Sequence, residues 1–173
     1  MRRTALLSAG LLLSLAAACG GSEAPAPEAP VTDWRFDGAT YEVVSGIAGD
    51  VSQAWIENDW SGDGVIVYLS DQEITCADFP REDVNLFPPL PTVDGATIWL
   101  KLTEKDTDAA LDYASFDIER SGSSSGLGTD AVRVGLTALE GGRVRGWLEF
   151  ASADGDPGAP VEIAGTFDVP FCD

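Results

Sequence analysis

Apolar and polar residues alternate along several stretches of the chain between residues 32 and 173. The clearest stretch is 96–103, in which every second residue from Ala96 to Leu102 is apolar. A period of two places successive side chains on opposite faces of an extended strand, so this pattern predicts β-strands. The pattern predicts strands at 40–44, 54–57, 65–70, 96–103, 113–120, 131–139, 143–152 and 161–169.

The last third of the chain allows a more detailed prediction. Residues 140–142 separate two alternating stretches, and their glycines can adopt the positive φ that a three-residue hairpin loop needs. Placing Leu139 opposite Arg143 brings apolar partners such as Val134 and Leu148 onto one face. A slip of one residue would mix the two faces, so we predict this register.

A sheet with one apolar face must cover that face, and packing two such sheets together is a common solution. We therefore expect an all-β fold, an antiparallel two-layer β-sandwich of seven or eight strands, immunoglobulin-like or similar. It would span residues 32–173, a length that can enclose its own core. A closed β-barrel is the alternative, because a sheet closed on itself covers the same face.

The first 18 residues have a different character. Two arginines precede an apolar run, and three alanines precede Cys19. This layout is typical of a secretory signal peptide, and its apolar part is too short to span a bilayer. The sequence "LAAAC" at 15–19 resembles the lipobox of bacterial lipoproteins. The alternative is plain secretion with a free cysteine.

The lipobox resemblance implies cleavage before Cys19 and acylation of that residue. More than one acyl chain would hold the protein stably on a membrane. Residues 19–31 would then form a flexible tether, since they are rich in Gly, Pro, Ser, Ala and Glu. The cysteine is followed by Gly20 instead of an aspartate. In this the sequence resembles lipoproteins that are sorted to the outer membrane in Gram-negative cells.

Two cysteines remain once Cys19 is assigned to lipid. Cys76 and Cys172 are then expected to form a disulfide bond, because an exported protein folds in an oxidising compartment. The bond would hold the C-terminus, since Cys172 is the penultimate residue. The alternative is a pair of reduced, buried thiols. The chain contains no histidine, so a Cys/His zinc site is not expected.

The chain is strongly acidic, with 29 acidic and 10 basic residues and a net charge of −19. Removing residues 1–18 takes away two arginines and no acid, which leaves 29 acidic and 8 basic residues and a net charge of −21. Such a surface repels nucleic acid and anionic lipid headgroups. We therefore expect no nucleic-acid partner, and membrane attachment through the acyl chains alone.

The sequence "GSSSG" at 122–126 matches the nucleophile elbow of serine hydrolases, with Ser124 in the position of the nucleophile. That motif requires a strand-to-helix turn and a histidine base, and neither is expected here, so we predict a flexible Gly/Ser loop. A hydrolase could also work with two carboxylates. No pair of acids stands out in the sequence, so we predict no catalytic residue and no enzymatic activity.

The sequence "DWSGDG" at 59–64 has the spacing of the first half of a calcium loop. Asp59, Ser61 and Asp63 would supply oxygen ligands, which makes Ca²⁺ the one cofactor to consider. The twelfth position is Ser70, where a complete loop would carry a glutamate. A polar hairpin turn is therefore the favoured alternative.

Three tryptophans lie at polar positions of the pattern: Trp60, Trp99 and Trp147. Aromatic rings at such positions can stack on sugars or anchor a protein partner. The alternative is that they cover the sheet, with Trp147 lying flat over Gly135. We expect a lipid-anchored envelope protein that serves as a binding or structural module for a protein or glycan. A carboxylate-based hydrolase and a Ca²⁺-stabilised adhesion domain are the alternatives.

Overall fold

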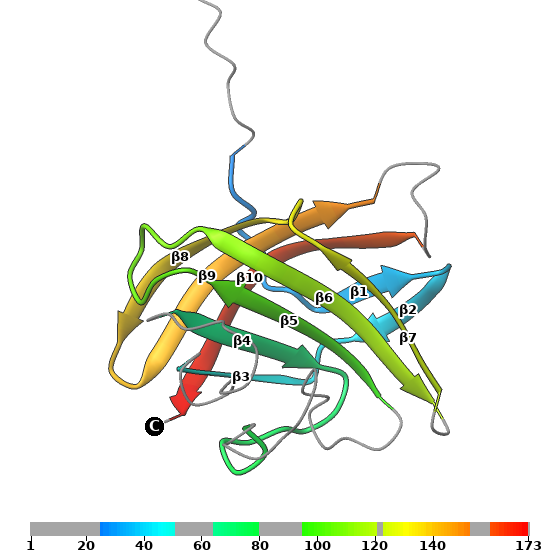
Figure 1. Ribbon diagram of the computed structural model, residues 1–173, viewed down its shortest axis with the longest axis horizontal. Helices are drawn as coiled ribbons and strands as arrows, with labels where there is room; N and C mark the ends of the chain where they lie inside the picture. The colour runs from blue at the N-terminus through cyan, green and yellow to red at the C-terminus, as the bar shows by residue number, and fades with distance from the viewer. Residues whose placement is uncertain (1–24, 51–63, 80–94, 121–122, 153–159, 173) are drawn as a thin grey trace, which may run out of the picture.

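The computed structural model describes residues 25–50, 64–79, 95–120, 123–152 and 160–172 (Figure 1). These residues form ten β-strands and no helix, which confirms the predicted all-β class. None of them therefore belongs to a helix that could cross a membrane. The strands are β1 (Asp33–Phe36), β2 (Ala39–Glu42), β3 (Ser45–Asp50), β4 (Val65–Ser70), β5 (Ala96–Leu102), β6 (Leu111–Arg120), β7 (Ser123–Thr129), β8 (Arg133–Glu140), β9 (Arg143–Ala151) and β10 (Val161–Cys172).

The ten strands belong to one curled sheet (Figure 1). Its order is β2-β1-β10-β3-β4-β5-β6-β7, and the β8–β9 hairpin joins it through β10. The pairings are antiparallel except that of β10 with β3, which is parallel, so the sheet is mixed where an antiparallel one was expected. Among the described strands, β7 and β8 are not paired with each other. The sheet is therefore an open half-barrel, where the alternative prediction was a closed barrel.

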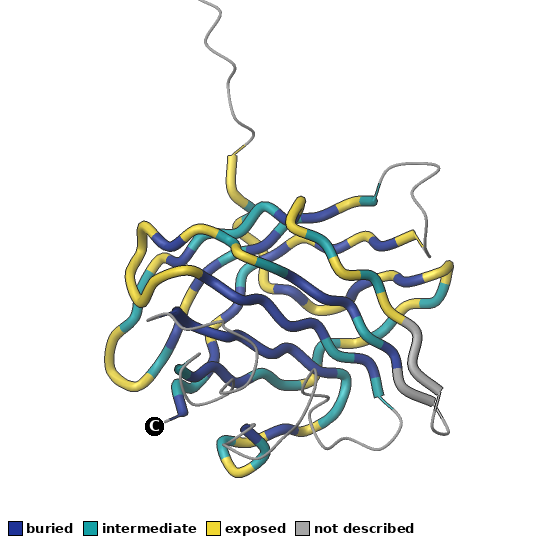
Figure 2. The backbone as a smooth tube through the Cα atoms, viewed as in Figure 1, coloured by how far each residue is buried: buried dark blue, intermediate teal, exposed yellow. Residues whose placement is uncertain are grey.

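The main core lies on the concave side of the half-barrel. Figure 2 shows that buried residues run along β4 and β5. Curling brings β6 and β9 face to face, so that the rings of Phe116 and Phe150 stack with centroids 5.4 Å apart. Trp34 of β1 packs against the same Phe116 ring at 5.7 Å. Burial alternates along β9 and most of β10, which have one face in the core and one face outward, as their sequence pattern predicts.

A second cluster, called here the outer cluster, covers the convex side of β3, β4 and β5. These strands are buried on both faces: all six residues of β4 are buried, and so are the adjacent residues Ile47 and Ala48 of β3. The predicted Cys76–Cys172 disulfide is present and lies at the edge of this cluster. The buried members of the outer cluster are Ile47, Ile66, Tyr68, Ile74, Phe79, Trp99 and Cys172.

The turn between β8 and β9 is one residue shorter than predicted. Residues 141–142 both have positive φ, +60° and +69°, which is the conformation of a two-residue type I′ hairpin turn. Glu140 is therefore opposite Arg143, whereas the predicted three-residue loop placed Leu139 there. Two successive glycines fit this turn because both central residues need a left-handed backbone.

A β-bulge between Leu136 and Ala138 compensates for the shorter turn. From Arg133 to Leu136, before the bulge, the predicted register holds, with Val134 opposite Leu148. From Ala138 to Glu140, after the bulge, the faces are exchanged, so that Leu139 lies on the concave face of the sheet together with Val144. This exchange turns the Leu139 side chain towards the core, near the open end of the half-barrel.

The sequence "GSSSG" at 122–126 was predicted to be a flexible loop, but residues 123–129 form strand β7, and every residue of β7 pairs with β6. Two glycines make this possible. A Cβ atom at Gly126 would overlap the Asp117 carboxylate, and one at Gly128 would overlap the Tyr113 hydroxyl. The side chains of β6 therefore lie across β7, and this packing offsets the low strand propensity of serine and glycine.

Residues 29–31, called here the N-terminal clip, run beside the middle of β10. The Val31 N–H donates to the Thr166 carbonyl oxygen at 2.8 Å, and the Thr166 N–H donates to the Ala29 carbonyl oxygen at 2.7 Å. Gly165 allows this approach, since a Cβ there would lie 2.6 Å from the Val31 nitrogen. The predicted strand at 54–57 lies outside the described residues.

Candidate functional site

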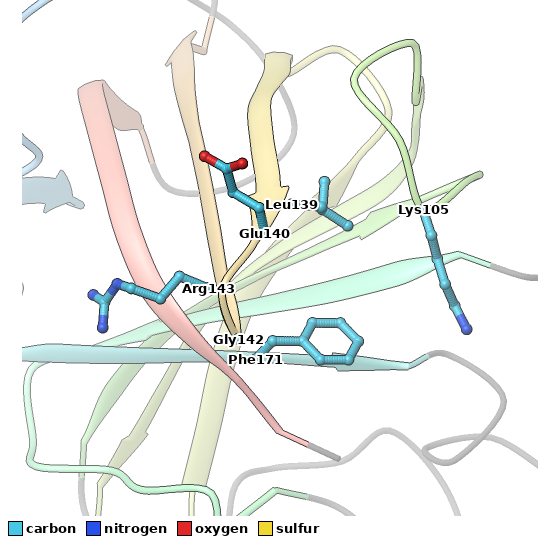
Figure 3. Close-up of a pocket in the computed structure, with 6 residues that line it drawn as sticks. All are labelled: Lys105, Leu139, Glu140, Gly142, Arg143 and Phe171. Carbon is cyan, nitrogen blue, oxygen red and sulfur yellow. The ribbon is translucent and has the colours of Figure 1, made fainter.

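A pocket opens at one end of the half-barrel, where the β8–β9 turn, the end of β10 and the loop between β5 and β6 meet (Figure 3). We call it the mouth pocket. Its volume is about 390 Å³, within the range of pockets that hold small ligands or single side chains. It is lined by Lys105, Leu139, Glu140, Gly142, Arg143 and Phe171.

The apolar part of the mouth pocket consists of Leu139 and Phe171. Both are half-buried and pack against the main core. Leu139 faces this side because the bulge pairs it with Val144, which is fully buried. The Phe171 N–H donates to the Gly142 carbonyl oxygen at 2.8 Å, which joins the end of β10 to the hairpin turn. Figure 3 shows both side chains on the side of the hairpin that faces Lys105.

Ion pairs hold the charged residues around the pocket. Lys105 is paired with Asp50, and Arg143 donates from Nε to Asp168 Oδ1 at 2.6 Å. Arg145 donates to the other oxygen of Asp168 at 3.2 Å. The hydrogen bond from Arg143, together with that from Arg145 and the charges of both, holds the pKa of Asp168 below its usual value.

Six charged side chains beside the mouth pocket are paired with one another. Arg145 also reaches Glu140, at 3.7 Å. Three cations and three carboxylates therefore balance here: Lys105, Arg143 and Arg145 with Asp50, Glu140 and Asp168.

Trp147, one of the predicted ligand contacts, lies half-buried on the outer face of β9. A Cβ at Gly135 would lie 2.7 Å from its Nε1 atom, so the indole lies across Gly135. The Arg133 guanidinium sits over the ring, 5.4 Å from its centroid, and is paired with Glu149. The ring thus packs between β8 and an arginine, which is how a covering tryptophan would be placed.

Trp99, another predicted ligand contact, is only 3% exposed. Its indole N–H donates to Asp117 Oδ2 at 3.0 Å, and its ring lies 5.3 Å from that of Tyr113. The alternating pattern placed this residue on a polar face, but that face is occupied by the outer cluster. Trp99 therefore packs inside the fold and has almost no surface to offer a ligand.

Asp117 is the described carboxyl whose environment most resembles that of a general acid. Burial raises its pKa, and hydrogen bonds with Ser115 and Trp99 act in the opposite direction. The residue lies on the convex side of β6 and does not line the mouth pocket. The raised pKa is accounted for by the burial of the carboxyl on this side of the sheet.

Tyr68 lies at the centre of the outer cluster. Its hydroxyl is buried and has no hydrogen-bond partner among the residues that the structure describes. Burial raises the pKa of Tyr68 far above its usual value, because the phenolate would have to form in an apolar environment.

Several predicted site residues lie outside the described ranges. These are the lipidation residue Cys19, the calcium ligands Asp59, Ser61 and Asp63, and the aromatic contact Trp60. Within the described ranges, no group of three or more His, Cys, Asp or Glu residues could hold a metal ion.

The sequence analysis did not single out the residues of the mouth pocket. Lys105, Leu139 and Phe171 come from three segments that are far apart in the chain, and none belongs to a recognisable motif. One signal was available: Phe171 precedes Cys172, so a disulfide that fixed the C-terminus would also fix this ring.

The comparisons with known proteins add no relative. No protein-family model matches the chain. No curated protein and no solved structure matches it either.

Proposed function

We propose that this chain is an exported, lipid-anchored envelope protein that acts as a binding module, and that its mouth pocket receives an apolar side chain of a protein partner. The observation that carries the second part is the pair Leu139 and Phe171, which is left half-exposed inside a pocket with a charged rim. The first part rests on the resemblance of residues 15–19 to a lipobox.

The mouth pocket has the composition of a protein-interface anchor site. Such sites combine an apolar floor, which takes a large side chain from the partner, with polar groups that surround it. Complete burial of a leucine or phenylalanine side chain contributes about 1.5–3 kcal/mol, and part of this remains available at Leu139 and Phe171.

The position of the pocket suits a protein that is held at its N-terminus. The ten residue steps from Cys19 to Ala29 span at most about 35 Å, so the domain would stay close to the membrane. In Figure 1 the first described residues and the C-terminus lie at opposite ends of the molecule. The mouth pocket, which includes Phe171 near the C-terminus, would then face away from the membrane.

The proposed pocket can be tested by site-specific photo-crosslinking in the native cell. A photoreactive amino acid is placed at position 105, on the rim, and at position 35 as a matched control, where Arg35 is exposed and ion-paired but distant from the pocket. We expect one envelope protein to be crosslinked from position 105 and not from position 35. Crosslinking should be lost with Leu139→Glu, provided that its urea denaturation shows a folded domain.

Two outcomes would overturn these proposals separately. Equal crosslinking from both positions, or crosslinking that Leu139→Glu leaves unchanged in a folded variant, would refute the pocket as the binding site. Intact mass of protein purified from its own cells tests the anchor. A mass without acyl chains on Cys19 would refute the anchoring and leave the pocket untouched.

A further inference from the structure

Strand β7 ends the sheet, and one of its edges is free. Among the described strands it pairs only with β6, so the backbone N–H and C=O groups on its other side have no strand partner. The β6–β7 register contains no shift, which leaves this edge regular over all of Ser123–Thr129. Such an edge is a template on which a further strand can form hydrogen bonds.

The sheet has two other free edges in its described part, and both are protected. β8 is interrupted by the bulge between Leu136 and Ala138, and it ends in the charged Glu140. β2 is four residues long and ends in Glu42. Bulges, charges and short length are the usual means by which proteins prevent edge pairing.

β7 has none of these protections. Its sequence, SSSGLGT, contains no charged residue and no proline. Gly126 and Gly128 are exposed, and the side chains that lie across them come from β6. In a chain with 29 acidic and 10 basic residues, seven consecutive uncharged residues on a sheet edge allow close approach of a second backbone.

We propose that the free edge of β7 binds an extended segment of a partner protein as an additional antiparallel or parallel strand. The residue of the partner segment that lies opposite Leu127 is apolar. Leu127 is half-buried against the main core, and an apolar neighbour on the same face extends that core. The two ends of the partner segment carry lysine or arginine, since Asp130 follows the β7 edge and the chain as a whole is acidic. This proposal does not depend on the mouth pocket.

A second copy of the chain is the competing occupant, because two β7 edges could pair with each other. Each copy carries a net charge of −19 as a full chain, so two copies repel each other at the moderate salt at which a basic segment is attracted. The charge of the chain therefore favours a basic segment from a different protein.

The proposal can be tested with a synthetic peptide in which alternating valine and threonine are flanked by two lysines at each end. We expect this peptide to slow hydrogen exchange of amides within residues 123–129, and the effect to weaken as salt is raised. A peptide of the same composition with a central proline, which cannot complete the ladder, should give no protection. A peptide flanked by glutamates should bind more weakly.

Two variants localise the effect. Ser124→Lys introduces a lysine into the β7 edge, at the register position opposite Glu119, and should weaken peptide binding about tenfold or more. Thr137→Lys, at the exposed bulge of β8, is the matched control and should leave binding unchanged. Thermal melting of both variants shows whether the domain remains folded.

Three results would overturn the proposal. The first is an absence of protection in β7 at peptide concentrations that saturate any binding. The second is protection of β8 or β2 in place of β7, or protection that Ser124→Lys does not reduce. The third is protection of β7 without peptide that rises with protein concentration, which would identify a second copy as the occupant.

Discussion

Replacing Cys76 and Cys172 together by alanine should lower the free energy of unfolding by several kcal/mol. The two residues are 96 positions apart in the sequence, and the chain-entropy model gives about 4.7 kcal/mol for closing a loop of this size. For a domain of about 140 residues, this corresponds to a melting temperature lowered by about 15 °C. We expect a measured loss of about 3–5 kcal/mol, because the reduced chain keeps some residual structure.

The local structure explains why other contacts will not replace the bond. The end of β10 pairs with β3 through only two residue pairs, Phe171 with Ala48 and Cys172 with Gly49. Without the disulfide this short parallel ladder should open before the rest of the sheet. Hydrogen exchange at residues 48–49 and 171–172 should therefore increase more than exchange in β4 or β9. The same opening would loosen Phe171 in the mouth pocket.

Urea denaturation followed by tryptophan fluorescence measures the effect. All samples carry Cys19→Ser, which prevents wrong pairing. We compare this protein with its disulfide intact, the same protein in excess reductant, and the same protein with Cys76→Ala and Cys172→Ala added. The dependence of the free energy on urea should steepen without the bond, because the unfolded chain expands. A loss below about 1 kcal/mol would refute the reasoning, since it would mean that the closed loop restricts the unfolded chain very little.

Two further predictions concern the convex side of the sheet. Tyr68→Phe removes a buried hydroxyl that has no partner among the described residues, and should raise the free energy of unfolding by about 1 kcal/mol; a loss of stability in urea would contradict this. Asp117→Asn should raise stability at pH 7, because burial raises the pKa of Asp117 and so disfavours its charged form, while the amide oxygen can still accept the Trp99 N–H. With a raised folded-state pKa, the carboxyl's stabilising contribution is present below the unfolded value of 3.8 and is lost as pH rises. The advantage of the Asn variant should therefore disappear as pH falls towards 3.8, and a variant that is less stable at every pH would contradict the prediction.

Alternation in the sequence predicted β9, which has one face in the core and one face outside, and β5, whose second face is covered by the outer cluster, but it missed β1, which also alternates between exposed and buried residues. β5 and β9 lie almost where the pattern placed them, at Ala96–Leu102 and Arg143–Ala151. β3 was not predicted as a separate strand, because Ile47, Ala48 and Gly49 are buried in succession. A strand between two clusters need not alternate, although β5, which also lies between them, does.

β7 was missed for a different reason. Serine and glycine are poor strand formers, and their own sequence predicts a loop. The strand exists because Tyr113 and Asp117 of β6 lie over its two glycines. This stabilisation comes from the neighbouring strand, so no local pattern could indicate it.

The mouth pocket could not be predicted because it depends on a shift of one residue. The predicted register put Leu139 opposite Arg143, on the outer face of the hairpin. The type I′ turn and the bulge after Leu136 instead pair Leu139 with Val144 and turn it towards the core. A bulge leaves no clear signature in a sequence, and here it decides whether the pocket has an apolar floor.

The way in which residues 29–31 join β10 determines how the domain would respond to a pulling force. Tension applied ahead of Ala29 reaches β10 through the two backbone hydrogen bonds at Thr166. Once they break, the load passes to the β1–β2 hairpin, which pairs with β10 at Arg35 and Phe36 and is held further by Trp34 in the main core. The hairpin, which has only two ladder pairs with β10, should therefore detach before β9, which has nine, and its release would lengthen the segment between the folded sheet and the point of pulling.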